Sequence, residues 1–434
     1  MMDPFNVGIL AIGLMMALTF GGIPIAFALA GVGIIGNMYL VGLPQTAMQI
    51  HMITWELGTN FLLIAVPLFV FMGQLVYHTE LAADLYGFVH KWFGRAPGGL
   101  AVTAVFTSAG FGAVTGSSVA AIATMGTMVM PQMKKYNYNL RLATGSMASA
   151  GTLAIMIPPS IPMVIYGVWT ETSIGKLFIA GIVPGILLTL GFCAYIIIRC
   201  ALNPSLGPPA ERYSWSDRLR AVGKLLPTAT IFIIILGGIY GGIFTPTEAS
   251  AIGAIGVLVV SLAMKRLSWQ RLKDSLLQTC EVSAMLFAIM FGGVMFSRLL
   301  VMTDVTPDLV NAIADLEVHR YVIILLFSVM FLLLGAVLDT FGMLILTLPL
   351  VFPVCRSLGF DPVWFGIYMT VMMEIAMLTP PIGLNVFVMQ KVTPEVALLE
   401  IFMGVTPFVL ICLLMVVLLV AFPQIVTWLP ATMM

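Results

Sequence analysis

Three prolines stand within five residues in Gly151-Thr-Leu-Ala-Ile-Met-Ile-Pro-Pro-Ser-Ile-Pro162. Each proline lacks a backbone donor and clashes with the preceding helical turn, so an α-helix cannot continue through this stretch. The flanking residues are apolar enough to lie in a membrane, where the break would free backbone carbonyls. Backbone of this kind needs a cavity lined by protein, so the sequence predicts a broken helix beside a polar cavity.

A second break, Thr379-Pro-Pro-Ile-Gly-Leu-Asn385, follows about 220 residues after the first. Other glycine and proline anchors recur in the same order at nearly the same offset. They are Gly21-Gly22-Ile23 with Gly241-Gly242-Ile243, Gly33 and Gly36 with Gly253 and Gly256, Gly112-Ala113-Val114 with Gly335-Ala336-Val337, and Gly181 and Pro184 with Gly404 and Pro407. Ordered anchors at one offset indicate an internal duplication, the common construction of secondary transporters.

The composition is that of an integral membrane protein. Hydrophobic residues make up 60% of the 434 residues and charged residues only 9%, which is more apolar surface than a soluble core hides. No basic stretch precedes the first apolar segment, so we expect it to remain as a helix and not to be a removable signal. The net charge of zero argues against a nucleic-acid partner. The five cysteines show neither metal-ligand nor disulfide spacing.

Each half of the chain fits three spans, a re-entrant helical hairpin, a broken helix and a final span. In the first repeat, residues 1–210, we expect spans at 5–20, 23–42, 59–77 and 177–198, a hairpin at 98–131 and a broken helix at 139–173. A cytoplasmic connector, 211–226, leads to the second repeat, 227–434, with spans at 227–243, 246–264, 279–300 and 401–421, a hairpin at 321–353 and a broken helix at 363–390. A hairpin that returns to its own side adds no crossing, so each half crosses five times and the second half is inverted. The expected fold is thus an all-α polytopic membrane protein built as an inverted repeat.

Basic residues give the orientation, because short cytoplasmic loops accumulate Lys and Arg. If Arg199 faces the cytoplasm, most of the 19 basic residues fall on its side. The exceptions are Lys176, Arg298, Arg320 and Arg356, and the loop after Arg298 is acidic, with Asp304, Asp308, Asp315 and Glu317. We therefore expect both termini on the periplasmic side.

Two segments have the pattern of amphipathic helices lying along the membrane surface. In 80–93 the apolar residues fall on one helical face, and Leu309, Val310, Ile313 and Leu316 do so at the matching place in the second half. Either segment alone fits an ordinary loop helix equally well. Their matching positions favour paired lateral braces around a moving core.

The two hairpin tips carry the polar chemistry. The first reads Gly110-Phe-Gly-Ala-Val-Thr-Gly-Ser-Ser118, and the second, from Gly335 to Gly342, contains Asp339. Freed carbonyls and hydroxyls suit a cation such as Na⁺, while half-helix N-termini suit an anion. A charge in the bilayer costs at least ~2.5 kcal/mol, so Asp339 should face a polar cavity and help to hold a cation.

Other polar residues are more ambiguous. Arg298 fits an anionic substrate, but it equally fits the lipid headgroups or a pair with Asp304. Glu248 fits a helix N-terminus behind Thr245-Pro-Thr. Glu281 and Glu374 are candidates for proton or ion coupling and are equally acceptable as buried, hydrogen-bonded acids.

Four motifs together resemble the large membrane subunit of tripartite ATP-independent periplasmic (TRAP) transporters. They are Gly112-Ala-Val-Thr-Gly-Ser-Ser-Val119, Ile157-Pro-Pro-Ser-Ile-Pro162, Thr245-Pro-Thr-Glu-Ala249 and Thr379-Pro-Pro-Ile-Gly-Leu-Asn385. The resemblance covers essentially the whole chain. It implies an elevator-type Na⁺/solute symporter of the ion-transporter superfamily.

The resemblance also implies two sodium sites and a substrate site. The first sodium site would use Gly112, Thr115, Ser117, Ser118, Ala154, Ile157 and Pro159; the second would use Gly335, Asp339, Thr340, Thr379, Pro381 and Gly383. Candidate substrate contacts are Ser117, Ser160, Arg298, Asp339 and Asn385. Ala154 stands where many relatives have glycine. Its carbonyl can still coordinate an ion, but alanine adopts fewer backbone conformations than glycine at this place. Two or more Na⁺ ions and no organic cofactor are expected.

Two partners follow from the same resemblance. One is a small four-helix membrane subunit, expected as a separate chain because the first span begins almost at Met1. The other is a periplasmic binding protein that delivers an organic acid, such as a C4-dicarboxylate or a sialic acid, to the bacterial inner membrane.

Three alternatives remain at this stage. A stand-alone Na⁺/carboxylate symporter of the same superfamily would work without a binding protein. A channel fits the composition, although inverted broken helices fit alternating access better. An intramembrane enzyme would need paired acids, or a serine with an embedded histidine, and the sequence offers neither constellation.

Overall fold

The computed structural model describes residues 2–315, 318–335 and 338–433, and every element in these ranges is helical. This confirms the expected all-helical class. Ala336 and Val337 of the second tip, and Leu316 and Glu317 after the second amphipathic segment, lie outside the described residues.

The first repeat contains both of its expected helix interruptions. Its helices are α1 (Pro4–Phe20), α2 (Ile25–Val41), α3 (Leu43–Thr59), η1 (Phe61–Ile64), α4 (Ala65–His78), α5 (Leu81–Phe93), α6 (Gly99–Thr115), α7 (Ser118–Lys135), α8 (Leu140–Met156), α9 (Ile161–Trp169), α10 (Ile174–Leu202) and η2 (Pro204–Leu206). The α6–α7 turn falls within the expected hairpin, and the α8–α9 interruption falls at the proline break.

The second repeat follows the same order. Its helices are α11 (Trp215–Tyr240), α12 (Pro246–Ala263), α13 (Trp269–Met302), α14 (Val305–Asp315), α15 (Arg320–Gly335), α16 (Thr340–Ser357), α17 (Pro362–Ala376), α18 (Leu384–Val392), α19 (Leu398–Ala421) and α20 (Gln424–Ala431). The duplication and its inversion themselves stay predictions, but this order is the one that they require.

The expectations miss the start of α11 and two whole helices, α3 and α20. Helix α11 begins inside the expected connector because Ser214 and Asp217 form a capping box, in which each side chain bonds the other's backbone N–H. Helix α3 occupies a stretch for which no helix was expected, since its polar residues hide the apolar pattern. The chain also ends on α20, where no helix was expected.

Helix pairs near the N-terminus of each repeat pack reciprocally. Gly33 on α2 lies against the backbone of Phe296 on α13, and Gly253 on α12 lies against Met72 on α4. Each repeat thus contributes one helix to each pair. Asn37 on α2 strengthens the first pair by donating to the carbonyl of Met295 at 3.1 Å.

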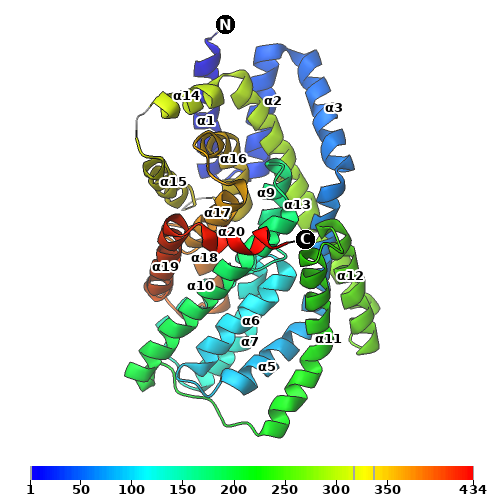
Figure 1. Ribbon diagram of the computed structural model, residues 1–434, viewed down its shortest axis with the longest axis vertical. Helices are drawn as coiled ribbons and strands as arrows, with labels where there is room; N and C mark the ends of the chain where they lie inside the picture. The colour runs from blue at the N-terminus through cyan, green and yellow to red at the C-terminus, as the bar shows by residue number, and fades with distance from the viewer. Residues whose placement is uncertain (1, 316–317, 336–337, 434) are drawn as a thin grey trace.

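The first halves of the two broken helices form the centre of the molecule. Every residue of α8 from Leu142 to Met156 is buried, as is every residue of α17 from Trp364 to Ala376. Figure 1 shows the α6–α7 hairpin in the lower half of the view, the α15–α16 hairpin in the upper half, and α17 and α18 between them. The hairpins therefore approach the central breaks from opposite ends.

The two expected braces are the helices α5 and α14. Helix α5 packs on hairpin helix α6, and α14 packs on hairpin helix α16. Each brace thus contacts the hairpin of its own repeat. An Arg266–Asp84 ion pair of 2.7 Å ties α5 to the loop before α13.

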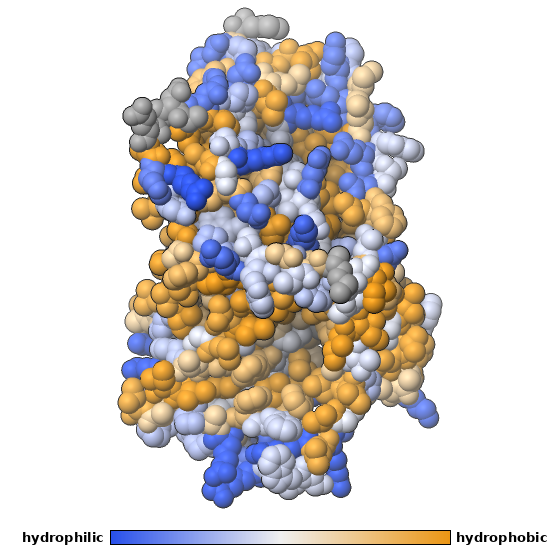
Figure 2. All heavy atoms as spheres, in the orientation of Figure 1, coloured by the Kyte–Doolittle hydropathy of each residue, from blue (hydrophilic) through white to orange (hydrophobic). Residues whose placement is uncertain are grey.

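The surface and the helix lengths both suit a bilayer. Among the described helices, eight are long and apolar enough to cross a membrane. Figure 2 shows a broad apolar band over the lower half of this face, with polar residues at the bottom and over the upper half.

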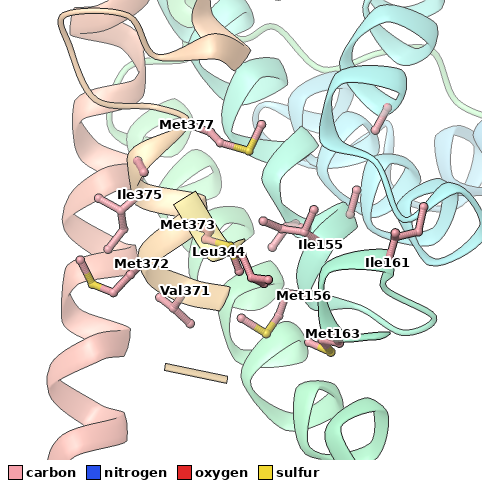
Figure 3. Packing of buried hydrophobic residues seen from close by; sticks show 14 of the residues in the cluster. Ile155, Met156, Ile161, Met163, Leu344, Val371, Met372, Met373, Ile375 and Met377 are labelled. Atoms are coloured by element: carbon pink, nitrogen blue, oxygen red, sulfur yellow. The ribbon is translucent and has the colours of Figure 1, made fainter. Parts of the chain in front are cut away.

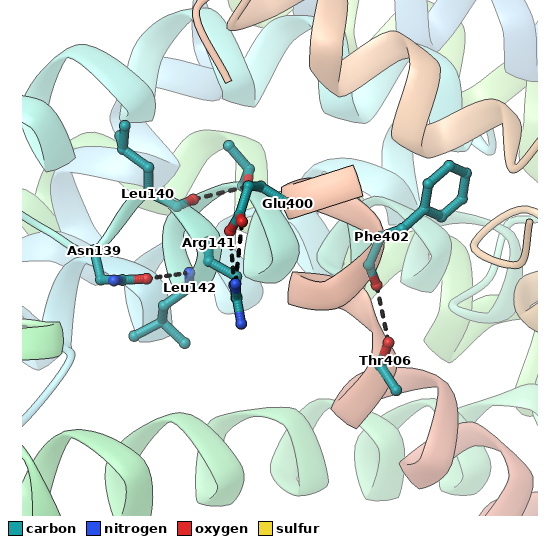
Figure 4. A network of polar contacts seen from close by, with 8 residues as sticks. Asn139, Leu140, Arg141, Leu142, Glu400, Phe402 and Thr406 are labelled. Atoms are coloured by element: carbon teal, nitrogen blue, oxygen red, sulfur yellow. Dashed lines mark hydrogen bonds and ion pairs between the residues drawn. The ribbon is translucent and has the colours of Figure 1, made fainter. Parts of the chain in front are cut away.

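Ion pairs connect the repeats beside α8. Arg141 donates two hydrogen bonds, of 2.8 and 3.1 Å, to the carboxylate of Glu400 on α19 (Figure 4). Lys134 at the end of α7 pairs with Glu395, and this hydrogen-bonded ammonium lowers the pKa of the Glu395 carboxyl. These contacts fasten the first hairpin and α8 to the last span of the second repeat.

We expect Gly33→Ala to destabilise the protein. A Cβ at this position would lie 2.8 Å from the backbone nitrogen of Phe296, so α2 and α13 would have to separate. Overpacking of this kind costs about 1–3 kcal/mol. Thermal unfolding in detergent measures the effect, and Gly31→Ala on the same helix is the control, because nothing lies within 4 Å of its Cβ. Equal melting temperatures for the two variants would contradict the reciprocal packing.

Candidate functional site

The first hairpin tip rests against the first helix break. Gly116 ends α6 at φ 58°, a left-handed conformation that favours glycine. A Cβ at Gly116 would lie 3.2 Å from the nitrogen of Ile161 and 3.3 Å from the carbonyl oxygen of Pro159. Ser117 then caps α7 by accepting a hydrogen bond from Ala120 N.

Each hairpin packs against its own broken helix through one glycine. A Cβ on Gly112 would lie 2.3 Å from Cα of Ala154 on α8, and a Cβ on Gly335 would lie 2.0 Å from Cβ of Ala376 on α17. The two contacts occupy matching places in the two repeats. They bring Gly112 close to Ala154 of the first predicted sodium site, and place Gly335 beside the end of α17.

The second tip places Asp339 at the N-terminus of α16. Its Oδ1 accepts a hydrogen bond of 3.0 Å from Gly342 N, so the carboxylate caps the helix. Asp339 joins no ion pair among the described residues. Thr340 follows as the first helical residue and is buried.

The two tips meet at the sulfur of Met377, at the end of α17. Ser118 Oγ donates to Met377 Sδ at 3.3 Å, and Thr340 Oγ1 donates to the same atom at 3.0 Å. Figure 3 shows Met377 at one end of a methionine-rich contact that joins α8 and α9 to α17. The structure thus brings together two predicted site residues from different repeats. Met377 was not predicted, because methionine is an ordinary core residue and nothing in the pattern distinguishes it among 31 methionines.

Asn385 connects the second break to both α17 and α8. Its backbone N–H donates to Met377 O at 3.1 Å, and its Nδ2 donates to Ala148 O at 3.4 Å. Its Oδ1 is buried and has no hydrogen-bond partner among the described residues. A buried acceptor oxygen without a donor is suited to a cation.

Several predicted ligands use their side chains within their own segment. Ser160 donates to the freed carbonyl of Ile155 at 2.6 Å, Thr115 to Phe111 O at 3.3 Å and Thr379 to Ala376 O at 3.3 Å. Each hydroxyl oxygen keeps lone pairs for a cation. The hydroxyl proton of Ser160, however, is not directed at a substrate.

The two proline breaks differ in exposure. Pro158 and Pro159 are buried and Ile157 is partly buried, whereas Pro380 and Pro381 are exposed. Both Pro-Pro peptide bonds are cis. Gly383 follows the second break at φ 56° and begins α18. The second break is therefore the more accessible of the two.

Arg298 lies apart from the tips. Its guanidinium is 4.0 Å from the carboxylate of Glu56 on α3. The sequence suggested Asp304 as an alternative partner and missed Glu56 because α3 was not expected.

The two candidate coupling acids have opposite surroundings. Glu374 on α17 is fully buried, and neither carboxylate oxygen has a partner in the described part of the chain. Glu281 on α13 is exposed. Of the two, only Glu374 lies in the buried centre, three residues before Met377.

Two polar cavities adjoin these elements. A cavity of about 200 Å³ lies between the first hairpin and helices α4 and α13, and its walls include Gln74, Thr115, Thr124 and Gln278. A second, of about 550 Å³, surrounds the Arg141–Glu400 pair. Only the smaller cavity reaches a predicted site residue, Thr115.

We expect Gly112→Ala to abolish the uptake that the resemblance implies, because its Cβ would collide with the backbone of α8 and displace the first tip. Gly110→Ala on the same helix is the matched control, since its Cβ would meet only the mobile end of Leu85 at 2.8 Å. Transport by equal amounts of reconstituted protein is the measurement. The additional change Ala154→Gly should not restore uptake, because Cα of residue 154 would itself lie too close to the new Cβ at position 112. Full activity of Gly112→Ala would contradict the close packing of the first tip on α8.

Comparisons with known proteins agree with this architecture. The family model described as "Tripartite ATP-independent periplasmic transporter, DctM component" matches residues 12–425. The C4-dicarboxylate TRAP transporter large permease protein DctM of Pseudomonas aeruginosa is 34% identical over 351 residues, covering 81% of this chain and 82% of its own. The ectoine/5-hydroxyectoine TRAP transporter large permease protein UehC of Ruegeria pomeroyi is 33% identical over 417 residues, covering 96% of each chain.

A solved structure shares the fold. The YdaH transporter of Alcanivorax borkumensis superposes with a TM-score of 0.59 at 15% identity, covering 88% of this chain and 89% of its own. The relatives are named as transporter permeases, so the chain is a transport protein and not an enzyme. The resemblance seen in the four motifs is confirmed: the chain belongs to the family of DctM components of tripartite ATP-independent periplasmic transporters.

Proposed function

We propose that this protein carries an organic acid across the bacterial inner membrane together with Na⁺, by an elevator movement of its central helices. The observation that carries the proposal is the meeting of Ser118 and Thr340 at Met377, because it joins both hairpin tips and a helix break at one point. Transporters of this construction bind substrate and coupling ions where discontinuous helices meet near the membrane midplane.

The oxygen atoms around the tips support Na⁺ as the coupling ion. Hard cations prefer carboxylate, hydroxyl and carbonyl oxygens. Asp339 offers a carboxylate oxygen, and Asn385 Oδ1 is a buried acceptor without a donor. In the first repeat, Gly112 lies close to Ala154, and Gly116 lies close to Pro159. These contacts bring carbonyls of the first tip and of the first break into one region. We assign two sodium sites to these regions, with the ligands named from the sequence.

The packing supports an elevator. The mobile module in this proposal comprises α6–α10 and α15–α19, which the Arg141–Glu400 and Lys134–Glu395 pairs hold together. The scaffold comprises α1, α2, α4 and α11–α13, in which the two repeats pack reciprocally. The 200 Å³ cavity lies between the two, with Gln74 and Gln278 on the scaffold side and Thr115 on the mobile side.

Membership of the family supports a substrate class and two partners. The two relatives are named for C4-dicarboxylates and for ectoine, which are small organic acids. We propose that a periplasmic binding protein delivers such an acid and that a small membrane subunit supports the scaffold. We propose, from the distribution of basic residues along the sequence, that both termini lie in the periplasm. A stand-alone Na⁺/carboxylate symporter is the alternative.

Reconstituted uptake distinguishes these functions. The chain and its small subunit are placed in vesicles, and uptake of a panel that includes labelled succinate and ectoine is followed under a Na⁺ gradient. Uptake that requires both Na⁺ and the binding protein is expected. Uptake without the binding protein would favour the stand-alone symporter, and flux that ignores Na⁺ would overturn the sodium sites.

Asp339→Asn should remove Na⁺-driven uptake while leaving the fold intact. Asparagine caps a helix about as well as aspartate, so the bond to Gly342 N survives and only the charge is lost. Asp361→Asn is the matched control, because Asp361 caps α17 in the same way, by accepting from Val363 N and Trp364 N. Initial rates against Na⁺ concentration are the measurement, and an unchanged Na⁺ dependence in Asp339→Asn would contradict its role.

A further inference from the structure

Met377 occupies a place that suits an anion better than a thioether. Its side chain is 4% exposed, and its sulfur is the hydrogen-bond acceptor for Ser118 and Thr340. A thioether sulfur is a weak acceptor, and two hydroxyls directed at it gain little compared with an oxygen. One hydroxyl of each tip is therefore held by a weak acceptor.

The position of these two hydroxyls explains why they do not donate to the backbone of their own helices. Ser118 and Thr340 are the first residues of α7 and α16, so neither has a carbonyl of its own helix one turn earlier. Other hydroxyls nearby lack this freedom: Thr115 donates to Phe111 O and Ser160 to Ile155 O. Both hydroxyl protons are thus already donated to a backbone carbonyl, so neither is available to an anionic ligand.

The surroundings also favour negative charge. The N-termini of α7 and α16, each 18 residues long, meet at Met377, and helix N-termini carry positive partial charge and free N–H groups. Asn385, whose N–H bonds the Met377 carbonyl, contributes the unpartnered buried Oδ1 described above. One oxygen suited to a cation thus lies beside donors suited to an anion, as the joint binding of Na⁺ and an acid requires.

We propose that the Met377 thioether is a placeholder for the substrate's carboxylate. In the unloaded carrier the sulfur accepts from Ser118 and Thr340. On loading, the carboxylate takes both hydrogen bonds and the methionine side chain rotates away, while each hydroxyl oxygen keeps its lone pairs for Na⁺. Methionine suits this role because three rotatable bonds let it repack without moving the backbone. The proposal rests on the function proposed above. It adds that residue 377 sets both the affinity for the acid and the room beside its carboxylate.

Two substitutions at Met377 should act in opposite directions. Met377→Ala removes the placeholder, so KM for the acid should fall by about three- to tenfold, and acids branched next to the carboxylate should become substrates. Met377→Ile keeps a large side chain that is stiff at χ1 and cannot rotate away, so KM should rise. The measurement is initial uptake of the acid that wild-type vesicles transport fastest from the panel of succinate, ectoine and related carboxylates. Activation by Na⁺ should remain as in the wild type.

Met373→Ala is the matched control, because Met373 is 1% exposed and lies one turn earlier on α17. It loses similar packing, so its stability should fall while KM stays unchanged. If Met377 has only a structural role, Met377→Ala, Met377→Ile and Met373→Ala should all lose stability and keep the same KM. Equal KM values for the three variants would overturn the placeholder proposal. Wild-type vesicles without Na⁺-driven uptake would instead overturn the proposed function, and with it this inference.

A second measurement follows Met377 itself. With ¹³C-methyl methionine, the Met377 signal is assigned by its loss in Met377→Leu. Addition of the transported acid with Na⁺ should shift or broaden this signal and leave that of Met373 in place. A Met377 signal unaffected by saturating acid would show that the side chain does not make way.

Discussion

A helix that ends inside a membrane leaves backbone carbonyls and amides that lipid cannot satisfy, and this constraint governs the centre of the protein. At the first break, Ser160 donates to the freed carbonyl of Ile155. At the second, Asn385 N donates to the carbonyl of Met377, and its side chain reaches Ala148 on α8. Because unpaired groups of this kind cost several kcal/mol, each break needs the other repeat or its own serine to be stable. The polar requirement of the second break thus ties it to α8 of the first repeat.

In the proposed mechanism, the hydroxyls of the two tips are suited to transport because their acceptor is weak. The Met377 sulfur accepts from Ser118 and Thr340, and the carboxylate of a substrate would be a stronger acceptor. The exposed second break, at Pro380 and Pro381, contrasts with the buried first break, which gives the two repeats different access to their surroundings.

The sequence predicted those features that proline, glycine and charge determine. The turn at Gly116 and the breaks at the two Pro-Pro pairs follow from residues that end a helix, glycine through its left-handed conformation and proline through its missing donor. Helix α3 escaped prediction because Gln45, Gln49 and Glu56 interrupt its apolar pattern, and with it the partner of Arg298 was missed. The sulfur contact of Met377 could not be predicted, since it depends on the three-dimensional meeting of residues far apart in the chain.

The distance between Ser118 and Thr340 tests the central claim most directly. In a chain with its five native cysteines replaced and a protease site placed between α10 and α11, Ser118→Cys and Thr340→Cys are introduced together and treated with Hg²⁺. Two thiols at these positions should bind one ion, so the cleaved halves should migrate together on a denaturing gel. The pair Ser118→Cys with Thr347→Cys, further along α16, should not link the halves. Halves that separate although both thiols at 118 and 340 react would show that the two tips do not meet.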